Sequence, residues 1–312
     1  MHRDRFVFTR PLQLLPVIFG ISIITFVLVR LIPGDPARVL LGTRATPTAI
    51  ASIRAQYGLD EPIWLQYLYF LRNLANGEMG KSILYKIDVL KLIVTRIEPT
   101  LALVLASVLL SVLIAVPMAA IAARNAGRAP DHAVRIISTF GIGFPPFWLG
   151  LMLIILFSVK LDLLPVSGYG ASFGDKLSHL VLPSLTIALS LSTVLTRSLR
   201  AAMIEQLKSD VATAARARGM PESIVFWRHV VPNSLVPTIN LLAVNIGWLI
   251  GGTVVIESVF AIPGMGQLLV RAIFSRDYMV VQGVAMVFAC ATVLVNFLAD
   301  IATVTADPRV KI

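Results

Sequence analysis

Charged residues are scarce in this chain. Asp, Glu, Lys and Arg make up 14% of its 312 residues, whereas hydrophobic residues make up 57%. A soluble globular domain carries about a quarter charged residues. The mean hydropathy of +0.83 points the same way. The composition therefore argues against a soluble domain and favours an integral membrane protein.

Cysteine and histidine are also rare. The single cysteine, Cys290, lies in an apolar run and excludes an internal disulfide. The four histidines are dispersed and lack the spacing of a metal site: His2, His132, His179 and His229. No Ser/Lys, Asp/Asp or HExxH pattern falls in an apolar run. We predict no metal site, no cofactor on this chain and no catalytic residue, so the chain is not expected to be an enzyme.

Acidic residues are fewer than basic ones, and the formal net charge is +10. Such a balance raises the question of nucleic-acid binding. No basic stripe alternates with aromatic residues, however, and Lys and Arg instead flank apolar runs. That pattern is typical of residues that orient membrane spans. We therefore predict contact with membrane lipid and no binding of nucleic acid.

Apolar runs are what this sequence has in quantity, and a bilayer is crossed by roughly 20 such residues. The sequence predicts an all-α integral membrane protein with six transmembrane helices. The first is too long for a signal peptide and lacks a cleavage site, so we expect it to be retained. The six predicted spans are Pro11–Leu31, Leu101–Ala123, Ala133–Phe157 (broken at Phe144–Phe147), Leu180–Leu199, Leu235–Ile256 and Val280–Val304.

The distribution of Lys and Arg predicts the orientation of these spans. With the N-terminus inside, the inner loops hold many basic residues, and the short outer loops hold only Lys160, Lys176, Arg271 and Arg276. Both termini are therefore expected in the cytoplasm. The predicted division is an N-terminal segment and first span (1–31), an extracytoplasmic helical loop (32–100) and a five-helix core (101–312).

The long outer loop carries helical patterns of its own. Thr46 to Tyr57 reads as one helix that Gly58 ends, and Pro62 to Leu74 as a second, amphipathic helix. Val89 to Arg96 is expected to lead into the second span, with a turn at Glu98–Pro99. We find no internal sequence repeat.

One segment of this loop fits a loose version of the phosphate-binding loop. It runs Ala75-Asn-Gly-Glu-Met-Gly-Lys-Ser82. That motif binds phosphate with glycine amides between a strand and a helix. Here an aromatic helical pattern precedes it, and its predicted side is away from ATP. We reject nucleotide binding for this segment.

The segment Arg200–Ser234, predicted to be cytoplasmic, is the most informative one. Asp210 is expected to cap a helix over Val211–Arg218, Gly219 to end it and Pro221 to begin a second helix. The first helix is rich in alanine, and small residues let a partner surface approach closely. The sequence therefore predicts a helical hairpin.

Motifs in this hairpin and along the chain resemble the permease subunits of ATP-binding-cassette (ABC) importers. Thr213-Ala-Ala, Gly219 and Pro232 match the spacing of their EAA loop, although Thr213 replaces its usual acid, His229 its Ile and Val231 its Leu. Further motifs are similar to the dipeptide/oligopeptide/nickel branch, and in it to the first permease of the pair. They are Ile32-Pro-Gly-Asp-Pro36, Tyr57-Gly-Leu-Asp60, Pro145-x-Phe-Trp148, Leu164-Pro-Val-Ser-Gly168, Glu257-x-Val-Phe-x-Ile-Pro-Gly-Met-Gly266, Arg276-Asp-Tyr-x-Val-Val-Gln-Gly283 and Asp307-Pro-Arg309. Pro232 departs from that first permease and is expected to kink the second helix.

The resemblance implies a function and a set of partners. The chain would form half of the translocation path for di- or oligopeptides or related small solutes, by alternating access, in the bacterial inner membrane. The implied partners are a homologous second permease subunit, two cytoplasmic ATPase subunits that hydrolyse ATP, and an extracytoplasmic substrate-binding protein. The hairpin would couple to the ATPase through Thr213, Ala214, Ala215, Arg216, Arg218 and Gly219. A hairpin that packs only on its own bundle is the alternative.

Polar and small residues of the fourth and fifth spans are candidates for the lining of the path. They are Ser190, Thr193, Asn240, Asn245, Gly247, Gly251 and Thr253. The alternative is helix packing, because Gly247 and Gly251 form a small-xxx-small pair and the others can hydrogen-bond neighbouring helices.

Two other functional classes stay open from the residues alone. A self-contained secondary transporter would need an acid–base chain within the membrane, and the charges here lie mostly at span ends. A membrane scaffold without transport is the other alternative. Neither accounts for the ordered motifs.

Overall fold

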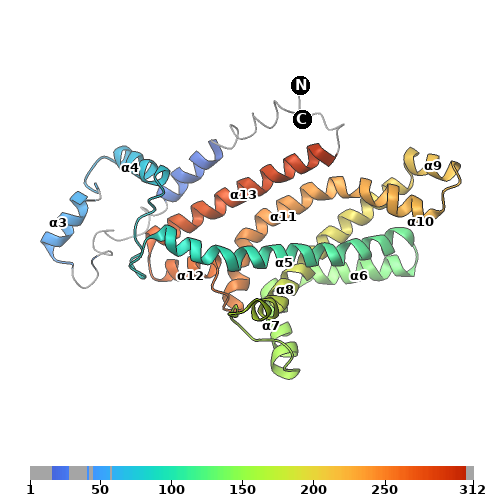
Figure 1. The fold of residues 1–312 in the computed structure, drawn as a ribbon, viewed down its shortest axis with the longest axis horizontal. Helices are drawn as coiled ribbons and strands as arrows, with labels where there is room; N and C mark the ends of the chain where they lie inside the picture. The colour runs from blue at the N-terminus through green and yellow to red at the C-terminus, as the bar shows by residue number, and fades with distance from the viewer. Residues whose placement is uncertain (1–15, 28–40, 42–44, 57, 307–312) are drawn as a thin grey trace. The chain divides into compact units, whose positions relative to one another are not determined.

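The computed structural model describes residues 16–27, 41, 45–56 and 58–306 (Figure 1). These residues form helices and connecting turns and no strand, which confirms the predicted all-helical class. Their helices are Pro16–Val27, α3 (Pro47–Gln56), α4 (Ile63–Ala75), α5 (Val89–Arg124), α6 (Ala129–Gly143), α7 (Pro146–Leu153), the π-helix η2 (Ile154–Lys160), α8 (Phe173–Leu207), α9 (Asp210–Ala217), α10 (Glu222–Ile224), the π-helix η3 (Val225–Val230), α11 (Val231–Val259), α12 (Met265–Phe274) and α13 (Tyr278–Ala306).

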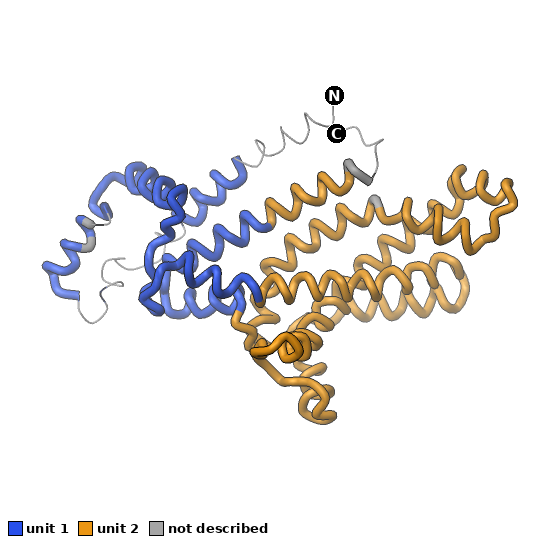
Figure 2. Tube along the Cα trace, in the orientation of Figure 1, with its two compact units in different colours: residues 1–98, 264–291 blue, residues 99–263, 292–312 orange. Residues whose placement is uncertain are grey.

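The chain divides into two compact units (Figure 2). Unit 1 holds residues 1–98 and 264–291, and unit 2 holds residues 99–263 and 292–312. Residues 264–291, far along the sequence, thus pack with the long N-terminal loop. The three-part division expected from the sequence stays a prediction.

Unit 1 is built around an apolar cluster of α5, α12 and α13. Val89, Ile93, Leu268 and Val284 are among its buried members. The close approach of α13 to α5 depends on Gly283, because a Cβ there would lie 2.7 Å from Cγ1 of Val89.

A buried carboxylate ties a loop of unit 1 to the start of α13. Asp277 is 1% exposed, and its Oδ2 accepts hydrogen bonds from Ser82 Oγ (2.5 Å) and from the Leu84 amide (3.1 Å). Ser82 Oγ also accepts from the Tyr85 amide (2.9 Å). These bonds fix the loop that follows α4.

Unit 2 packs α6, α7 and α11 around α8. The helix α8 contributes buried residues along most of its length, including Leu182, Leu191, Leu199 and Met203. One apolar cluster lies toward the end of α8 that precedes α9, and a second lies around Leu182 and Phe260. The first of these clusters supports the hairpin.

The two expected helices of the long loop are confirmed as α3 and α4. The Ala49 amide donates to Thr46 Oγ1 (3.3 Å), and Gly58 follows α3 with φ of +61°. The turn expected at Glu98–Pro99 is wrong, because α5 continues through it from Val89 to Arg124. A proline removes one helical hydrogen bond but holds a φ that suits a helix, so apolar packing on both sides outweighs the loss.

Four described helices are long and apolar enough to cross a membrane: α5, α8, the part of α11 from Pro237, and α13 as far as Thr303. The pair formed by α6 and α7–η2 passes the same test together and bends sharply between its members. The bend lies at the predicted Phe144–Phe147 break. The first predicted span is described only as Pro16–Val27, so the count of six stays a prediction.

The rejected phosphate-loop segment follows α4, as the sequence indicated, and no strand precedes it. A single bridge between Lys81 and Asp88 closes the loop that comes next. This context does not match the strand–loop–helix arrangement that binds phosphate.

Candidate functional site

The hairpin is built by α9, α10 and the start of η3. Ser209 is its N-cap, since Ser209 Oγ accepts a hydrogen bond from the Ala212 amide (3.4 Å). The expectation that Asp210 is the cap is wrong by one residue; Asp210 lies in the first helical turn, where an acid favours the helix dipole. Ser209 is the cap because its short hydroxyl reaches the free amide of Ala212.

Gly219 ends α9 as expected. Its φ of +78° lies in the left-handed region, and the Met220 amide donates to the Ala215 carbonyl (3.2 Å). Apart from its two chain neighbours, no residue has an atom within 4 Å of the place a Cβ would take. Glycine is therefore needed here for its backbone conformation and not for space.

The helix α9 has two different faces. Ala212 and Ala215 are 1% and 4% exposed and pack into the cluster with Met203 and Phe226. Thr213, Ala214 and Ala217 on the same helix are exposed. The buried alanines hold the helix on its own bundle, and the exposed face of small residues is open to a partner.

Arg216 closes the hairpin and does not project away from it. Its Nε donates to Glu222 Oε1 (2.5 Å) and its Nη1 to the Leu207 carbonyl (3.0 Å). The hydrogen bond from Arg216 lowers the pKa of the exposed Glu222 carboxyl. The contribution of this pair is therefore present at neutral pH and is lost as the pH falls through the lowered pKa. Arg218, the C-cap, is exposed.

The second helix of the hairpin contains a π-helical stretch directly before Pro232. The residues Val225–Val230 form η3, and α11 begins at Val231. A proline within a helix lacks an amide hydrogen and crowds the carbonyl four residues earlier. The departure expected at Pro232 thus takes the form of a wider helical turn ahead of it, with Val225, Phe226 and Val230 buried.

Two contacts beneath the hairpin were not anticipated from the sequence. The Arg124 guanidinium at the end of α5 lies 5.4 Å from the ring centroid of Phe226. Asp131 of α6 is buried, accepts from Arg200 of α8 at Nε (2.5 Å) and Nη2 (2.7 Å), and accepts from the Gly127 amide (2.9 Å). The only signal for the second pair was an acid inside an arginine-rich loop.

The candidate path residues separate into three groups. Ser190 and Asn245 lie together on a groove of about 240 Å³ between α8 and α11, next to the exposed Trp248. Thr193 and Thr253 are buried and hydrogen-bond backbone carbonyls of their own helices.

The remaining candidates lie away from that groove. Asn240 accepts a hydrogen bond from Thr303 (2.7 Å) of α13, and Gly247 faces Thr292, whose methyl lies 3.1 Å from a Cβ built there. Gly251 is exposed with open space beside it. Ser190 and Asn245 thus line the groove, and Asn240 and Gly251 are exposed outside it.

Comparison with known proteins decides the family. Residues 115–312 match the family described as binding-protein-dependent transport system inner membrane component, and residues 3–104 match its N-terminal region. The chain belongs to this family. It is therefore a permease of an ABC importer, a multi-pass protein of the inner membrane, and not a member of a catalytic enzyme family.

The chain is similar over nearly its whole length to proteins with a stated transport role. It is 35% identical over 306 residues to the glutathione transport system permease protein GsiC of Escherichia coli strain K12, covering 98% of each chain. The same identity and coverage hold for GsiC of Shigella dysenteriae.

Solved structures support the fold. A chain of the MetNI methionine ABC transporter in an inward-facing conformation has a TM-score of 0.59 at 17% identity, covering 69% of this chain and 96% of that one. An amino acid ABC transporter has a TM-score of 0.52 at 15% identity, covering 68% and 93%. Membership in this family implies ATPase and permease partners.

Proposed function

We propose that the chain forms half of the translocation path of an ATP-driven importer for short peptides or peptide-like solutes such as glutathione. Its similarity to glutathione permeases across 98% of both chains supports this class of solute. The partners would be a second homologous permease, two ATPase subunits on the cytoplasmic side and a substrate-binding protein on the other. The hydrolysis of ATP would take place on the ATPase subunits.

The observation that carries the coupling role is the division of α9 into two faces. A helix that served only its own bundle would gain by placing large polar side chains on its outer face. Instead, Thr213, Ala214 and Ala217 leave a shallow exposed surface at the tip of a hairpin whose other face is anchored. A surface of small side chains admits the close approach of another backbone, and we infer that it seats on an ATPase subunit.

The anchoring gives this contact a way to transmit force. The buried Ala212 and Ala215 join α9 to the cluster of α5, α8 and α11 residues. A displacement of the hairpin would then move these helices together, including the two that carry the Ser190–Asn245 groove. This groove is the part of the path that we propose a solute contacts.

Co-purification with ATPase subunits tests the coupling role. Ala214→Asp places a charge on the exposed face of α9, and we expect it to abolish both the retention of ATPase subunits and ATP-dependent uptake into vesicles. Ala51→Asp, at an exposed alanine in α3, is the matched control and should leave retention unchanged. Unchanged retention and uptake in Ala214→Asp would refute the coupling surface.

A secondary transporter and a membrane scaffold, the two alternative functions, would each give a different experimental result. Uptake by the purified chain without ATPase partners, driven by an ion gradient, would indicate a secondary transporter. Retention of partners without any ATP-dependent uptake of peptides, glutathione, nickel chelates or sugars would indicate a scaffold.

A further inference from the structure

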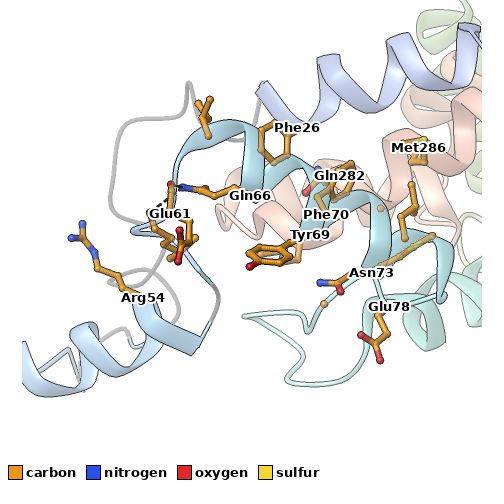
Figure 3. A pocket seen from close by; sticks show the side chains of 17 residues that line it. Phe26, Arg54, Glu61, Gln66, Tyr69, Phe70, Asn73, Glu78, Gln282 and Met286 are labelled. Carbon is orange, nitrogen blue, oxygen red and sulfur yellow. Dashed lines mark hydrogen bonds between the residues drawn. The ribbon is translucent and has the colours of Figure 1, made fainter.

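Unit 1 and unit 2 each contain a cavity that the coupling role does not explain. The cavity of unit 1, about 480 Å³, lies along α4, and side chains such as Phe26, Phe70 and Met286 make its walls mainly apolar (Figure 3). The Gln282 amide in these walls is buried and makes no hydrogen bond. The cavity of unit 2, about 380 Å³, is an open groove with the exposed Arg124 on its rim. Only the groove of unit 2 thus combines an apolar wall with a charge that an outside molecule can reach.

This groove, which we call the Trp227 groove, is formed by the end of α5 and one indole ring. Trp227 lies in η3, is 53% exposed and meets the buried Phe226 edge to face, with the ring centroids 5.4 Å apart. The groove thus places a cation, an amide and an indole next to apolar side chains. Its lining residues are Pro117, Ala120, Ile121, Arg124, Asn125 and Trp227.

The apolar side of the groove continues along α5 as an exposed stripe, the α5 stripe. Its members follow one another at every fourth residue, so each is a neighbour of the next on the helix surface. From Leu101 to Ile121 the stripe extends about 30 Å, which equals the thickness of the hydrocarbon core of a bilayer. Arg124 follows one turn later and therefore lies close to the level of the lipid headgroups. The stripe consists of Leu101, Leu105, Leu109, Leu113, Pro117 and Ile121.

The size of its side chains distinguishes the α5 stripe from a contact between helices. Transmembrane helices that pack closely on one another use small residues such as Gly, Ala and Ser. The stripe has four leucines and an isoleucine, whereas the exposed residues of α11 include Gly251 and Gly252. The α5 stripe therefore suits the acyl chains of lipid better than a second protein subunit.

Arg124 brings to the groove a charge that is free to pair with an outside anion. It forms no ion pair with any residue that the structure describes. Its guanidinium lies 5.4 Å from the ring centroid of Phe226, and this contact positions it. Glu222 interacts electrostatically with Arg124, but the Glu222 carboxylate is already bonded to Arg216.

Asn125 adds a second donor beside this charge. Its side-chain amide gives one N–H to the Ile121 carbonyl (2.8 Å), and the other N–H has no acceptor among the described residues. Both Asn125 and Arg124 line the groove. A phosphate in the groove can therefore accept from a guanidinium and from an amide, which are both common donors to phosphate.

We propose that the Trp227 groove binds one anionic phospholipid. The phosphate pairs with Arg124 and accepts from Asn125. The Trp227 ring packs against the glycerol, and an acyl chain lies along Ile121 and Leu113. A lipid with a net negative charge neutralises Arg124, whereas a zwitterionic headgroup brings a second cation to the site. The inference depends on the membrane location of this family and not on the solute or on the coupling role.

The experiment measures lipid binding to the purified full chain by native mass spectrometry. Dioleoylphosphatidylglycerol is the anionic probe, and dioleoylphosphatidylcholine, with the same acyl chains, is the zwitterionic one. We expect the first phosphatidylglycerol to bind about tenfold more tightly than the first phosphatidylcholine, because its net charge favours the pair with Arg124. Arg124→Gln should remove this preference. Trp227→Ser should weaken the binding of both lipids, since both lose the contact with the ring.

Arg128→Gln is the matched control. It removes an arginine that is also exposed and lies four residues further on, but does not line the groove. It should leave the preference for phosphatidylglycerol unchanged. Equal losses in Arg128→Gln and Arg124→Gln would overturn the site in favour of general attraction between a basic protein and anionic lipid. An unchanged preference in Arg124→Gln would overturn it directly.

A purely structural role of Arg124 gives a different pattern. Arg124→Lys keeps the charge and should keep the preference for phosphatidylglycerol. Loss of the preference in Arg124→Lys, with an unfolding midpoint lowered as much as in Arg124→Gln, would overturn the lipid site. Displacement of the lipid by inorganic phosphate alone would overturn it in favour of a simple anion site. Loss of the bound lipid when the chain is purified with its second permease would overturn it in favour of a subunit interface.

Discussion

At the scale of single residues, the pair of Asp131 and Arg200 holds α6 to α8 at the base of the hairpin. Both bonds of the guanidinium fork reach the carboxylate, and the Asp131 side chain is 1% exposed. Loss of either member leaves the other charged group without its partner. Removing one partner of such a buried pair costs about 3–5 kcal/mol.

We expect Asp131→Asn to lower the thermal unfolding midpoint of the purified chain in detergent. The loss of stability should lie toward the lower end of that range, because Arg200 is 24% exposed. Glu222→Gln is the control, since it breaks the solvent-exposed pair with Arg216 and should change the midpoint little. Equal midpoints for Asp131→Asn and the unaltered chain would show that the pair does not stabilise the bundle.

Gly219 offers a prediction about the backbone alone. A non-glycine residue in the left-handed region costs roughly 1–2 kcal/mol, and Asn tolerates it better than Ala. Because a Cβ at Gly219 meets no other atom, Gly219→Ala should accelerate hydrogen exchange of the amides of α9 by about tenfold, and Gly219→Asn should do so less. Identical exchange in the two variants would mean that conformation at this position does not limit the hairpin.

At the scale of elements, the two faces of α9 can be tested separately. Ala215→Leu adds three carbons to a filled cluster, which costs about 1–3 kcal/mol, so the unfolding midpoint should fall. Ala214→Leu lies on the exposed face and should leave the midpoint unchanged while it weakens the retention of ATPase subunits. A fall in midpoint for Ala214→Leu, or none for Ala215→Leu, would reverse the assignment of the faces.

The hairpin shows what local sequence can predict. Gly219 ends one helix where the pattern placed it, and Pro221 is the N-cap of the next helix, which begins one residue later at Glu222. The cap is Ser209 and not the expected Asp210. Both side chains can accept a hydrogen bond from a free amide of the first turn, and the sequence does not distinguish them. The partner of Arg216 was not predictable, since Glu222 meets it only after the chain has turned.

Contacts between distant parts of the chain were beyond the sequence. Nothing in the pattern joins Ser82 to Asp277, because periodicity reports which face of a helix is apolar and not what covers it. The cavity of unit 1 was missed for the same reason: Gln282 occurs in a recognised motif, but its unpaired amide is visible only once α13 lies beside α4.

At the scale of the whole molecule, the orientation depends on one bent element. From the long N-terminal loop to the hairpin the chain passes through α5, through the pair of α6 and α7–η2, and through α8. If the bent pair crosses the membrane, three crossings put loop and hairpin on opposite sides. If the pair enters and leaves on the same side, two crossings put them on the same side, and the excess of Lys and Arg in the inner loops argues for the first arrangement.

Cysteine accessibility distinguishes these arrangements. In a Cys290→Ser background, Asn76→Cys at the exposed end of α4 and Ala217→Cys in α9 each provide one exposed thiol. We expect a membrane-impermeant maleimide to label Asn76→Cys only from outside intact spheroplasts and Ala217→Cys only in inverted vesicles. Permeabilised membranes, in which both should react, control for accessibility of each thiol. Labelling of both variants from one side would show that α6 and α7–η2 do not cross. If that side is the outside, the hairpin would lie where no cytoplasmic ATPase can reach it.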